Sequence, residues 1–362
     1  MCNRRLADDE YTGAGVSIGQ LAHIVGWSTA SGSPRGKDEL PGDERNDEDN
    51  LMLLCYDQHR VIDNRSLWDV YDVKTLRTMK RRHEHRVRQL TDLVEDDKTT
   101  VLRIIGSIRG ASVSAPPQTV ANALLANGRF PDYALLGVDE LEVDLRQLAG
   151  ENPATNSYWE VGRDTIAQQL RLLRAKVDRE NVRHISVFAF ARIPLLVALG
   201  AELDDSIPTE IYPKRRNGDE GWGWLSDAAT SEFEFRTVRT GADPARVAIM
   251  FSISGTVNPA LLPGTVDSDY YLYELGPAVG NPNPDIIANA ATLDNFAQTW
   301  RALLAYLEAQ HPGLDTVDIF PAVPIPAAIT IGQAPMRHVH PTLRVYDRTA
   351  DMGYELALEV NR

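Results

Sequence analysis

The spacing of hydrophobic residues changes near residue 100, and the first 100 residues carry short, separate elements. Apolar positions recur every three or four residues between 72 and 95, which predicts a long amphipathic helix with Asp72 as its N-cap. The elements expected before that helix are a strand–turn–strand unit at 15–35, an acidic loop at 38–49, a short buried apolar run at 51–55 and a helical turn at 56–63.

After residue 100, apolar strands alternate with amphipathic helices. This alternation indicates a mainly parallel sheet that is covered by helices on both faces. Helices are expected at 116–127, 165–179 and 292–310. Strands are expected at 101–107, 185–191, 207–212, 232–238, 246–253, 269–275, 316–320 and 342–347.

Two segments of this second part align without gaps. Phe188–Gly200 and Phe320–Gly332 each read as a strand, a turn, a proline in the first helical turn, an apolar helix and a C-terminal glycine. A chance match between short apolar segments is one explanation. A true repeat would give two Rossmann-like half-units related by a pseudo-twofold axis. Two helix N-termini would then face one crevice at the carboxyl ends of the strands.

The polar stretch 95–100 separates the two patterns, so we expect one domain over 1–98 and another over 99–362. Hydrophobic residues make up 43% of the chain and charged residues 24%, as in globular proteins. We see no apolar run long enough to cross a bilayer, and no apolar stretch near the N-terminus that would mark a signal peptide. Two cysteines favour a reducing compartment. We therefore expect a cytoplasmic protein without membrane partners.

Charge is unevenly distributed along the chain. The formal net charge is −14, which argues against a general nucleic-acid coat protein. Basic residues nevertheless concentrate between 74 and 88, where Lys74, Arg77 and Arg81 could contact DNA phosphates. The alternative is that this run is only a solvated helix face.

His23, Asn50 and His59 are candidate catalytic residues on a strand, in a loop and at the start of a helix. Phosphodiester hydrolysis requires a base that activates water and a cation that stabilises charge on the phosphate. A neutral histidine can be the base, and a second histidine can hold the metal. Asp63 is four residues after His59, so both could bind one divalent ion, Mg²⁺ first, with Mn²⁺ or Ni²⁺ as alternatives.

This order of residues resembles the HNH, or ββα-metal, nuclease motif. The resemblance implies an α+β nuclease module over the first domain. It also implies that Asn50 either braces the loop that carries His23 against the helix or contacts the metal.

The sequence departs from the HNH pattern at two places. Ala22 stands where many members have a carboxylate or histidine ligand just before the base. Many members also hold a structural zinc with two cysteine pairs, whereas here only Cys2 and Cys55 remain and Gln58 stands where a further ligand would fall. A complete structural zinc site is therefore not expected, unless a longer N-terminus supplies the missing ligands.

Four segments in the second part carry another resemblance: Val187–Gly200, Trp222–Trp224, Phe251–Gly255 and Phe320–Gly332. Their order resembles the SAVED domain, an α/β fold of two fused CARF-like Rossmann units found in bacterial anti-phage (CBASS) signalling. The resemblance implies that this domain binds a cyclic di- or trinucleotide made by a partner cyclase. For the whole chain it implies a homo-oligomeric effector, a dimer or larger when activated, that degrades double-stranded DNA.

A cyclic nucleotide needs aromatic platforms for its bases and cations or N–H groups for its phosphates. The candidate ligand-binding residues are Arg192, Tyr212, Lys214, Arg215, Trp222, Trp224, Ser252, Ser254, Phe320 and Pro321. The alternative interpretation of the basic and aromatic residues between 212 and 224 is a basic loop beside a core tryptophan pair. The alternative for the two serines is a plain strand exit.

Two other functions stay open at this stage. Ala22, Gln58 and the incomplete cysteine set fit a cyclic-nucleotide-binding regulator whose nuclease half has decayed. An ordinary HNH restriction enzyme would need a strongly basic DNA-reading domain, which the net charge of −14 disfavours.

Overall fold

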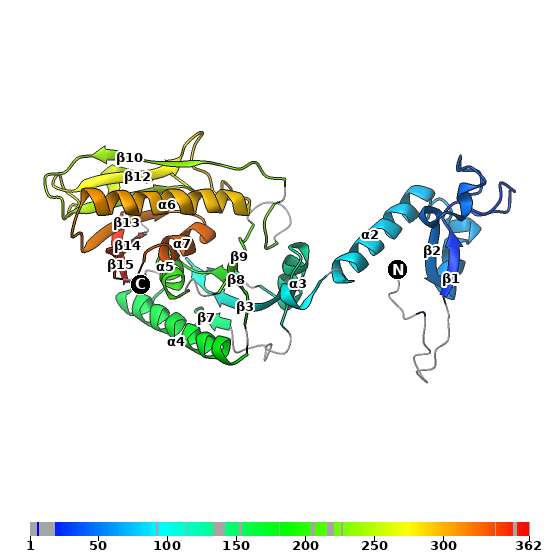
Figure 1. The fold of residues 1–362 in the computed structure, drawn as a ribbon, viewed down its shortest axis with the longest axis horizontal. Coiled ribbons are helices and arrows are strands. Elements are labelled where there is room, and N and C mark those ends of the chain that lie inside the picture. Colours follow the sequence, from blue (N-terminus) through cyan, green and yellow to red (C-terminus); the bar gives the residue numbers. More distant parts are fainter. Residues whose placement is uncertain are drawn as a thin grey trace. The chain divides into compact units, whose positions relative to one another are not determined.

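The structure is a computed structural model of the 362-residue chain (Figure 1). It describes residue 6 and residues 19–91, 93–113, 115–132, 142–151, 154–180, 182–203, 207–215, 221–225, 227–336, 338–349 and 353–361. The chain divides into two compact units, residues 1–93 and 94–362.

The N-terminal unit is a β-hairpin followed by two helices. Strands β1 (Gly19–His23) and β2 (Leu51–Cys55) pair in antiparallel register. One face of the hairpin packs against helices α1 (Tyr56–Ile62) and α2 (Val73–Thr91). The core between them consists of Ala22, Ile24, Met52, Leu54, Ile62 and Leu76. The hairpin and α1 together form a ββα unit.

Two expectations for this unit are wrong. A strand before residue 36 was expected to pair with β1, but residues 24–43 form turns and β1 pairs with β2 instead. Residues 15–18 of the expected unit lie outside the described residues. The run 51–55 is also not buried throughout, since Leu53 is 60% exposed. It faces away from the helices, directly opposite Leu21 of β1. A two-stranded hairpin covered on one side leaves every second side chain in solvent.

A buried asparagine holds the connection between β1 and β2. Asn50, the last residue of a 3₁₀ turn η2 (Glu48–Asn50), is 3% exposed. Its Oδ1 accepts from the backbone N–H of Val25 at 2.8 Å. Its Nδ2 donates to the carbonyl oxygens of Val25 at 2.9 Å and Arg45 at 2.8 Å. The buried Arg45 guanidinium in turn donates to several loop carbonyls, including that of Gly26. Side chains rather than a strand ladder therefore satisfy this loop backbone.

Helix α2 begins where the sequence predicts and ends earlier. The Asp72 carboxylate accepts from the N–H of Thr75 at 2.7 Å, so the predicted N-cap is confirmed. The helix ends at Thr91, and Val87 and Val94, both expected on its apolar side, are exposed. The polar linker expected over 95–100 is shorter, because Lys98 already opens the next strand.

The C-terminal unit contains two principal sheets. The larger has the order β10-β12-β11-β13-β14-β15, with parallel central strands and antiparallel edges. Its strands are β10 (Phe233–Arg239), β11 (Val247–Ser252), β12 (Tyr271–Pro277), β13 (Thr316–Ala322), β14 (Thr342–Arg348) and β15 (Tyr354–Val360).

The smaller sheet has the order β6-β3-β8-β9, with β7 also paired to β3. A short hairpin, β4 (Ser107–Ile108) with β5 (Ala111–Ser112), follows β3. The strands of the smaller sheet are β3 (Lys98–Ile105), β6 (Phe130–Pro131), β7 (Glu142–Asp144), β8 (Ile185–Phe190) and β9 (Thr209–Ile211).

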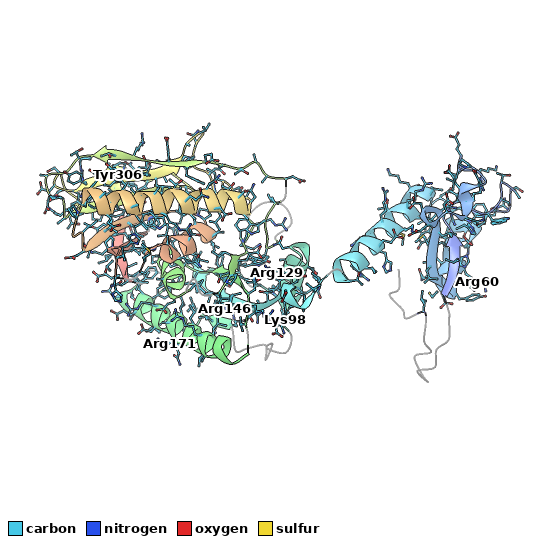
Figure 2. All side chains as sticks on the ribbon, in the orientation of Figure 1. Arg60, Lys98, Arg129, Arg146, Arg171 and Tyr306 are labelled. Carbon is cyan, nitrogen blue, oxygen red and sulfur yellow. The ribbon has the colours of Figure 1, made fainter. Side chains whose placement is uncertain are left out.

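Four helices form the shared core of the two sheets (Figure 1). Tyr306 of α6, labelled in Figure 2, contacts Phe235 of β10 and Tyr273 of β12. The outer face of the smaller sheet is covered by α3 (Pro117–Ala126). The outer face of the larger sheet is covered by loop residues such as Val257 and Val266, so helices on both faces hold only for the smaller sheet. The core helices are α4 (Asn156–Glu180), α5 (Ile193–Glu202), α6 (Ala290–Gln310) and α7 (Ile325–Gln333).

The internal repeat is confirmed by a reciprocal contact between α5 and α7. A Cβ added to Gly200 would lie 1.9 Å from the carbonyl oxygen of Ile329. A Cβ added to Gly332 would lie 1.9 Å from the carbonyl oxygen of Val197. Gly200 aligns with Gly332 and Val197 with Ile329, so each contact is the image of the other. The glycines therefore lie inside the helices and permit their close crossing, rather than ending them as expected.

Among the described residues, every helix is too short or too polar to meet the requirements of a bilayer-spanning segment.

Gly332→Ala should destabilise the C-terminal unit, because the added methyl group collides with a helix backbone that cannot move aside alone. Overpacking of this kind costs about 1–3 kcal/mol or more. The matched control is Gly264→Ala, where an added Cβ meets nothing within 4 Å. Thermal unfolding of the two variants should show a clear loss of melting temperature only for Gly332→Ala. Equal melting temperatures would contradict the close crossing.

Asn50→Ala should loosen the loop between β1 and β2, because it leaves buried backbone groups of Val25 and Arg45 unpaired. An unsatisfied buried group costs about 1–3 kcal/mol. Hydrogen exchange over residues 24–50 should become faster, whereas Asp49→Ala, at an exposed neighbour, should leave it unchanged. Unchanged protection in the Asn50 variant would argue against the brace.

Candidate functional site

His23 lies at the end of β1 and is partly exposed. Its Nε2 is 3.1 Å from Oδ1 of Asn46, which belongs to a 3₁₀ turn η1 (Glu44–Asn46). The exposed ring of Trp27 packs edge-on against the imidazole, with a centroid separation of 6.0 Å. The imidazole is thus oriented by one hydrogen bond and one ring contact while part of it remains open to solvent.

His59 lies on α1, where side chains hold both of its ring nitrogens. Nδ1 is 2.9 Å from Oε1 of Gln20 on β1, and Nε2 is 3.2 Å from Oδ2 of Asp63. Asp63 is the C-cap of α1, one helical turn beyond His59. The predicted pairing of His59 with Asp63 on one face of the helical turn is therefore present, and Gln20 is an additional partner.

Arg35 fixes Asp63 and ties the end of β1 to the end of α1. Its guanidinium contacts Oδ1 of Asp63 at 3.0 Å. It also donates to the carbonyl oxygens of Ile24 and Ile62, each at 2.6 Å. The Arg35 side chain is only 5% exposed and that of Asp63 is 32% exposed, so this ion pair is partly shielded from solvent. Sequence reasoning missed Arg35, although an arginine in a Gly/Ser/Pro loop between two site residues is a signal for such a tie.

His59 and Asp63 fit the requirements of a divalent ion. In octahedral coordination with bonds of about 2.1 Å, neighbouring ligand atoms lie about 3 Å apart. The separation of 3.2 Å between Nε2 of His59 and Oδ2 of Asp63 matches that spacing. Within the described part of the chain no group of three His, Cys, Asp or Glu side chains converges. These two side chains would therefore hold an ion that keeps several water ligands, as Mg²⁺ does.

The other predicted nuclease residues fall into different environments. Asn50 uses both its amide oxygen and its amide nitrogen on backbone partners, which fits the bracing role rather than contact with a metal. Ala22 is completely buried in the hairpin core. Lys74, Arg77 and Arg81 are exposed on α2. Cys55 is buried at the end of β2, and Cys2 lies outside the described residues.

The C-terminal unit contains a cavity of about 640 Å³ at the point predicted from the repeat. Its walls include the residues that precede and open α5 and α7, such as Arg192 and Pro324, which are equivalent in the two half-units. Two helix N-termini and the carboxyl ends of β8 and β13 thus meet at one crevice. Such a crevice is where open α/β sheets bind ligands, and N-termini attract anions.

Half of the predicted ligand residues line this cavity. They are Arg192, Lys214, Arg215, Ser254 and Pro321. Sequence reasoning missed six charged or aromatic residues that also line it: Arg109, Phe190, Asp285, Asp347, Arg348 and Tyr354. Arg348 is the last residue of β14, and Tyr354 is the first residue of β15. No ligand contact was expected there, because the strand β15 had not been predicted.

The remaining predicted ligand residues do not line the cavity. Tyr212 is fully buried, stacks on Phe188 at 4.5 Å and donates its hydroxyl to Glu210. Trp222 packs edge-on against the same Phe188, and Phe320 belongs to the core on the outer face of the larger sheet. These aromatic side chains form the core and are not platforms for a ligand.

Ser252 and Trp224 are also directed elsewhere. The Ser252 hydroxyl donates to Glu274 at 2.7 Å and accepts from the N–H of Val257 at 3.1 Å. Trp224 packs against the shared core and does not line the cavity. Its buried indole Nε1 has no hydrogen-bond partner. Because both hydrogen bonds of Ser252 are made within the protein, this serine orders a loop. This agrees with the alternative interpretation, a plain strand exit.

Arg192 lines the cavity but is fully engaged with the protein. It forms ion pairs with Glu151 at 3.1 Å and with Asp347, and its guanidinium lies 5.4 Å from the ring centre of Trp159. Burial raises the pKa of the Asp347 carboxyl, and the attraction of Arg192 partly offsets this effect. Arg192 joins the two half-units at the cavity wall, which fits a role in holding them in position.

Comparisons with solved structures return SAVED/CARF-domain containing receptors. The Acinetobacter baumannii Cap4 receptor with the cyclic trinucleotide 2'3'3'-cAAA has 14% identity and a TM-score of 0.48, covering 84% of this chain and 60% of that one. The same receptor with 3'3'3'-cAAA has 14% identity and a TM-score of 0.49 with the same coverage. The Moraxella osloensis Cap4 receptor has 11% identity and a TM-score of 0.42, covering 73% of this chain and 50% of that one. This chain thus spans about 60% of the length of the first of these receptors.

Among curated proteins no relative was found. Two family models match separate parts of the chain. The HNH endonuclease model matches residues 7–68, which include the hairpin, α1 and both candidate histidines. The model for the SMODS-associated and fused to various effectors sensor domain matches residues 166–360, which include the two equivalent helices and most of the cavity. The chain therefore belongs to the SAVED sensor family and carries an HNH endonuclease domain at its N-terminus.

Proposed function

We propose that this protein is a ligand-activated DNA endonuclease of bacterial anti-phage defence, in which cyclic oligonucleotide binding by the SAVED domain switches on the HNH domain. The observation that carries the proposal is the presence of both domains in one chain. Each domain also has residues that suit its part: His23 and the His59–Asp63 pair in one, and the 640 Å³ cavity in the other. The cytoplasm is the compartment where such a protein would meet its activator and DNA.

In the nuclease domain, His23 acts as the general base. It accepts a proton from water, the water oxygen bonds to phosphorus, and the bond to the leaving deoxyribose oxygen breaks as that oxygen gains a proton from solvent. His59 and Asp63 hold a divalent ion, Mg²⁺ above all. When bound, that ion supplies positive charge opposite the scissile phosphate. Arg35 keeps Asp63 in place, and exposed Lys74, Arg77 and Arg81 take neighbouring phosphates.

In the sensor domain, the cavity receives a cyclic di- or trinucleotide. Such a ligand repeats one phosphate and one base per unit, so a pocket built from two equivalent half-units offers it matching anion sites. The N-termini of α5 and α7 supply backbone N–H groups. Lys214, Arg215 and Arg109 supply positive charge along the wall.

One metal site cuts one strand, so cleavage of double-stranded DNA requires two nuclease domains. We therefore propose that ligand binding favours a homo-oligomer, a dimer or a larger assembly, over a resting form. Unrestricted DNA degradation in an infected cell would end that cell together with its phage.

A specific observation supports a second candidate, a cyclic-nucleotide-binding regulator with an inactive nuclease half. Ala22 is buried at the position where many HNH domains place a metal ligand, and the described residues offer only two converging ligands. The two functions differ in one outcome. The regulator binds the cyclic nucleotide without cutting DNA.

Plasmid cleavage separates the candidates. In the presence of Mg²⁺, the purified protein alone should leave plasmid DNA intact. It should degrade the plasmid when the matching member of a panel of cyclic di- and trinucleotides is added. Binding of a cyclic nucleotide, measured by calorimetry, without any cleavage would support the regulator. Cleavage at fixed sites without a cyclic nucleotide would support a restriction enzyme.

His23→Asn should abolish activated cleavage, by about 10²-fold or more, because it removes the group that accepts the proton. Ligand binding and ligand-driven assembly, measured by calorimetry and light scattering, should remain. The matched control is His338→Asn at an exposed position in the other unit. Normal cleavage by the His23 variant would show that the base is a different residue.

Lys214→Glu should weaken cyclic nucleotide binding, because it places a negative charge where phosphates are expected. Loss of one charge-assisted hydrogen bond corresponds to about 10- to 100-fold in affinity. Arg171→Glu makes the same change at a residue of α4 (labelled in Figure 2) that does not line the cavity, and should leave the affinity unchanged. Equal affinities in calorimetry would place the ligand elsewhere.

A further inference from the structure

The hydrogen bond between Asn46 and the imidazole of His23 bears on which ring nitrogen carries the proton. The carbonyl oxygen of the Asn46 side chain lies 3.1 Å from Nε2 of the ring. A neutral imidazole has one N–H donor and one bare nitrogen, and its hydrogen bonds decide which is which. An amide oxygen can only accept a hydrogen bond. This contact therefore favours the tautomer with the proton on Nε2 of His23, which leaves Nδ1 as the bare nitrogen.

The backbone around Asn46 is fixed by the buried amide of Asn50. Nδ2 of Asn50 donates to the carbonyl of Arg45, the residue before Asn46. The carbonyl of Asn50 accepts from the N–H of Ile24, the residue after His23, at 2.8 Å. One buried residue thus holds the chain next to both members of the pair. This anchoring explains how an exposed side chain can keep a defined position.

We propose that Asn46 is the positioning residue of the general base: it holds His23 in the Nε2–H tautomer, so that Nδ1 takes the proton from water. This inference rests on the proposed nuclease function. Asn46 does not contact the scissile phosphate in this account. It acts through His23, by orientation and by choice of tautomer.

The charged surroundings of His23 bear on how Asn46 variants will respond to pH. The Arg35 guanidinium lies 3.3 Å from the backbone oxygen of His23. Glu44 and Asp47 flank Asn46 in the acidic loop, and both are exposed. On β2, the residue opposite His23 is the uncharged Leu51. A carboxylate at position 46 would place a negative charge within hydrogen-bond distance of the ring, and it would favour the protonated imidazole.

The tautomer can be measured without any activity. In full-length protein labelled with ¹⁵N-histidine, the His23 ring signals, assigned by their loss in His23→Ala, should show a protonated Nε2 and a bare Nδ1. In Asn46→Ala the two tautomers should become mixed. A wild-type spectrum with the proton on Nδ1 would overturn the inference even if the protein cuts DNA.

Cleavage kinetics give the second test. Asn46→Ala should lower kcat by about 10- to 100-fold, the usual effect of removing a partner that orients a histidine, with KM for DNA little changed. Asn46→Asp keeps the accepting oxygen and should retain more activity than Asn46→Ala. The acid limb of its pH–rate profile should move upward by about one pH unit.

The control for added charge is Thr29→Asp, at an exposed loop residue near His23 in the sequence. It should leave the acid limb in place. Wild-type kcat in Asn46→Ala, or an unmoved acid limb in Asn46→Asp, would overturn the inference. A wild-type protein that cuts no DNA under any condition would instead contradict the proposed function, and the ¹⁵N spectra would still decide the role of Asn46.

Discussion

The geometry of the nuclease site depends on the buried amide of Asn50. Its three side-chain hydrogen bonds join Val25, just beyond the candidate base, to Arg45, just before the residue that orients this base. A loop rich in glycine, serine and acidic residues has little apolar surface to bury, so polar side chains must hold its backbone. Asn50, Arg35 and Arg45 do this from within the loop or at its end. The imidazole of His23, the candidate base, can thus be positioned by a module with only a small hydrophobic core.

In the sensor domain, a duplicated structural unit positions the residues that line the cavity. Two equivalent helices cross so closely that Gly200 and Gly332 each face a backbone carbonyl of the other helix. This close crossing brings the residues that open both helices to the walls of one cavity. The ion pair of Arg192 with Asp347 then joins the first half-unit to β14 at the cavity wall. The walls of the cavity therefore combine the packed ends of two core helices with loop residues such as Lys214 and Ser254.

The sequence predicted the elements that have strong periodicity. Helices α2 and α6 and most of the parallel strands were predicted from apolar runs and spacing, because one buried face repeats at a fixed interval. The repeat was predicted from the ungapped match of two segments, whereas the short parallel strands β6 and β7 were not predicted. The partner of β1 could not be predicted this way, since pairing with Leu51–Cys55 depends on loop hydrogen bonds made by Arg35 and Arg45. The antiparallel edge strand β15 was missed because its alternating residues are half exposed.

The residues of the candidate sites could also be predicted only in part. His59 and Asp63 could be paired from their spacing, because a helix brings residues four apart onto one face. The aromatic residues Tyr212 and Phe320 were assigned to the ligand, but residue type does not separate a core ring from a stacking platform. Their burial depends on which face of a sheet each side chain takes. The roles of Gln20 and Asn46 needed coordinates, since each joins a histidine far away in the sequence.

The central claim is that occupancy of the sensor cavity controls hydrolysis at the nuclease site. The most direct measurement is a titration of one protein sample with the activating cyclic oligonucleotide, in which bound ligand and DNA cleavage rate are recorded together. The account predicts that both rise in step, and that Lys214→Glu shifts both midpoints to higher ligand concentration by the same factor. Cleavage that stays constant while the cavity fills, or that appears while it is empty, would contradict the account.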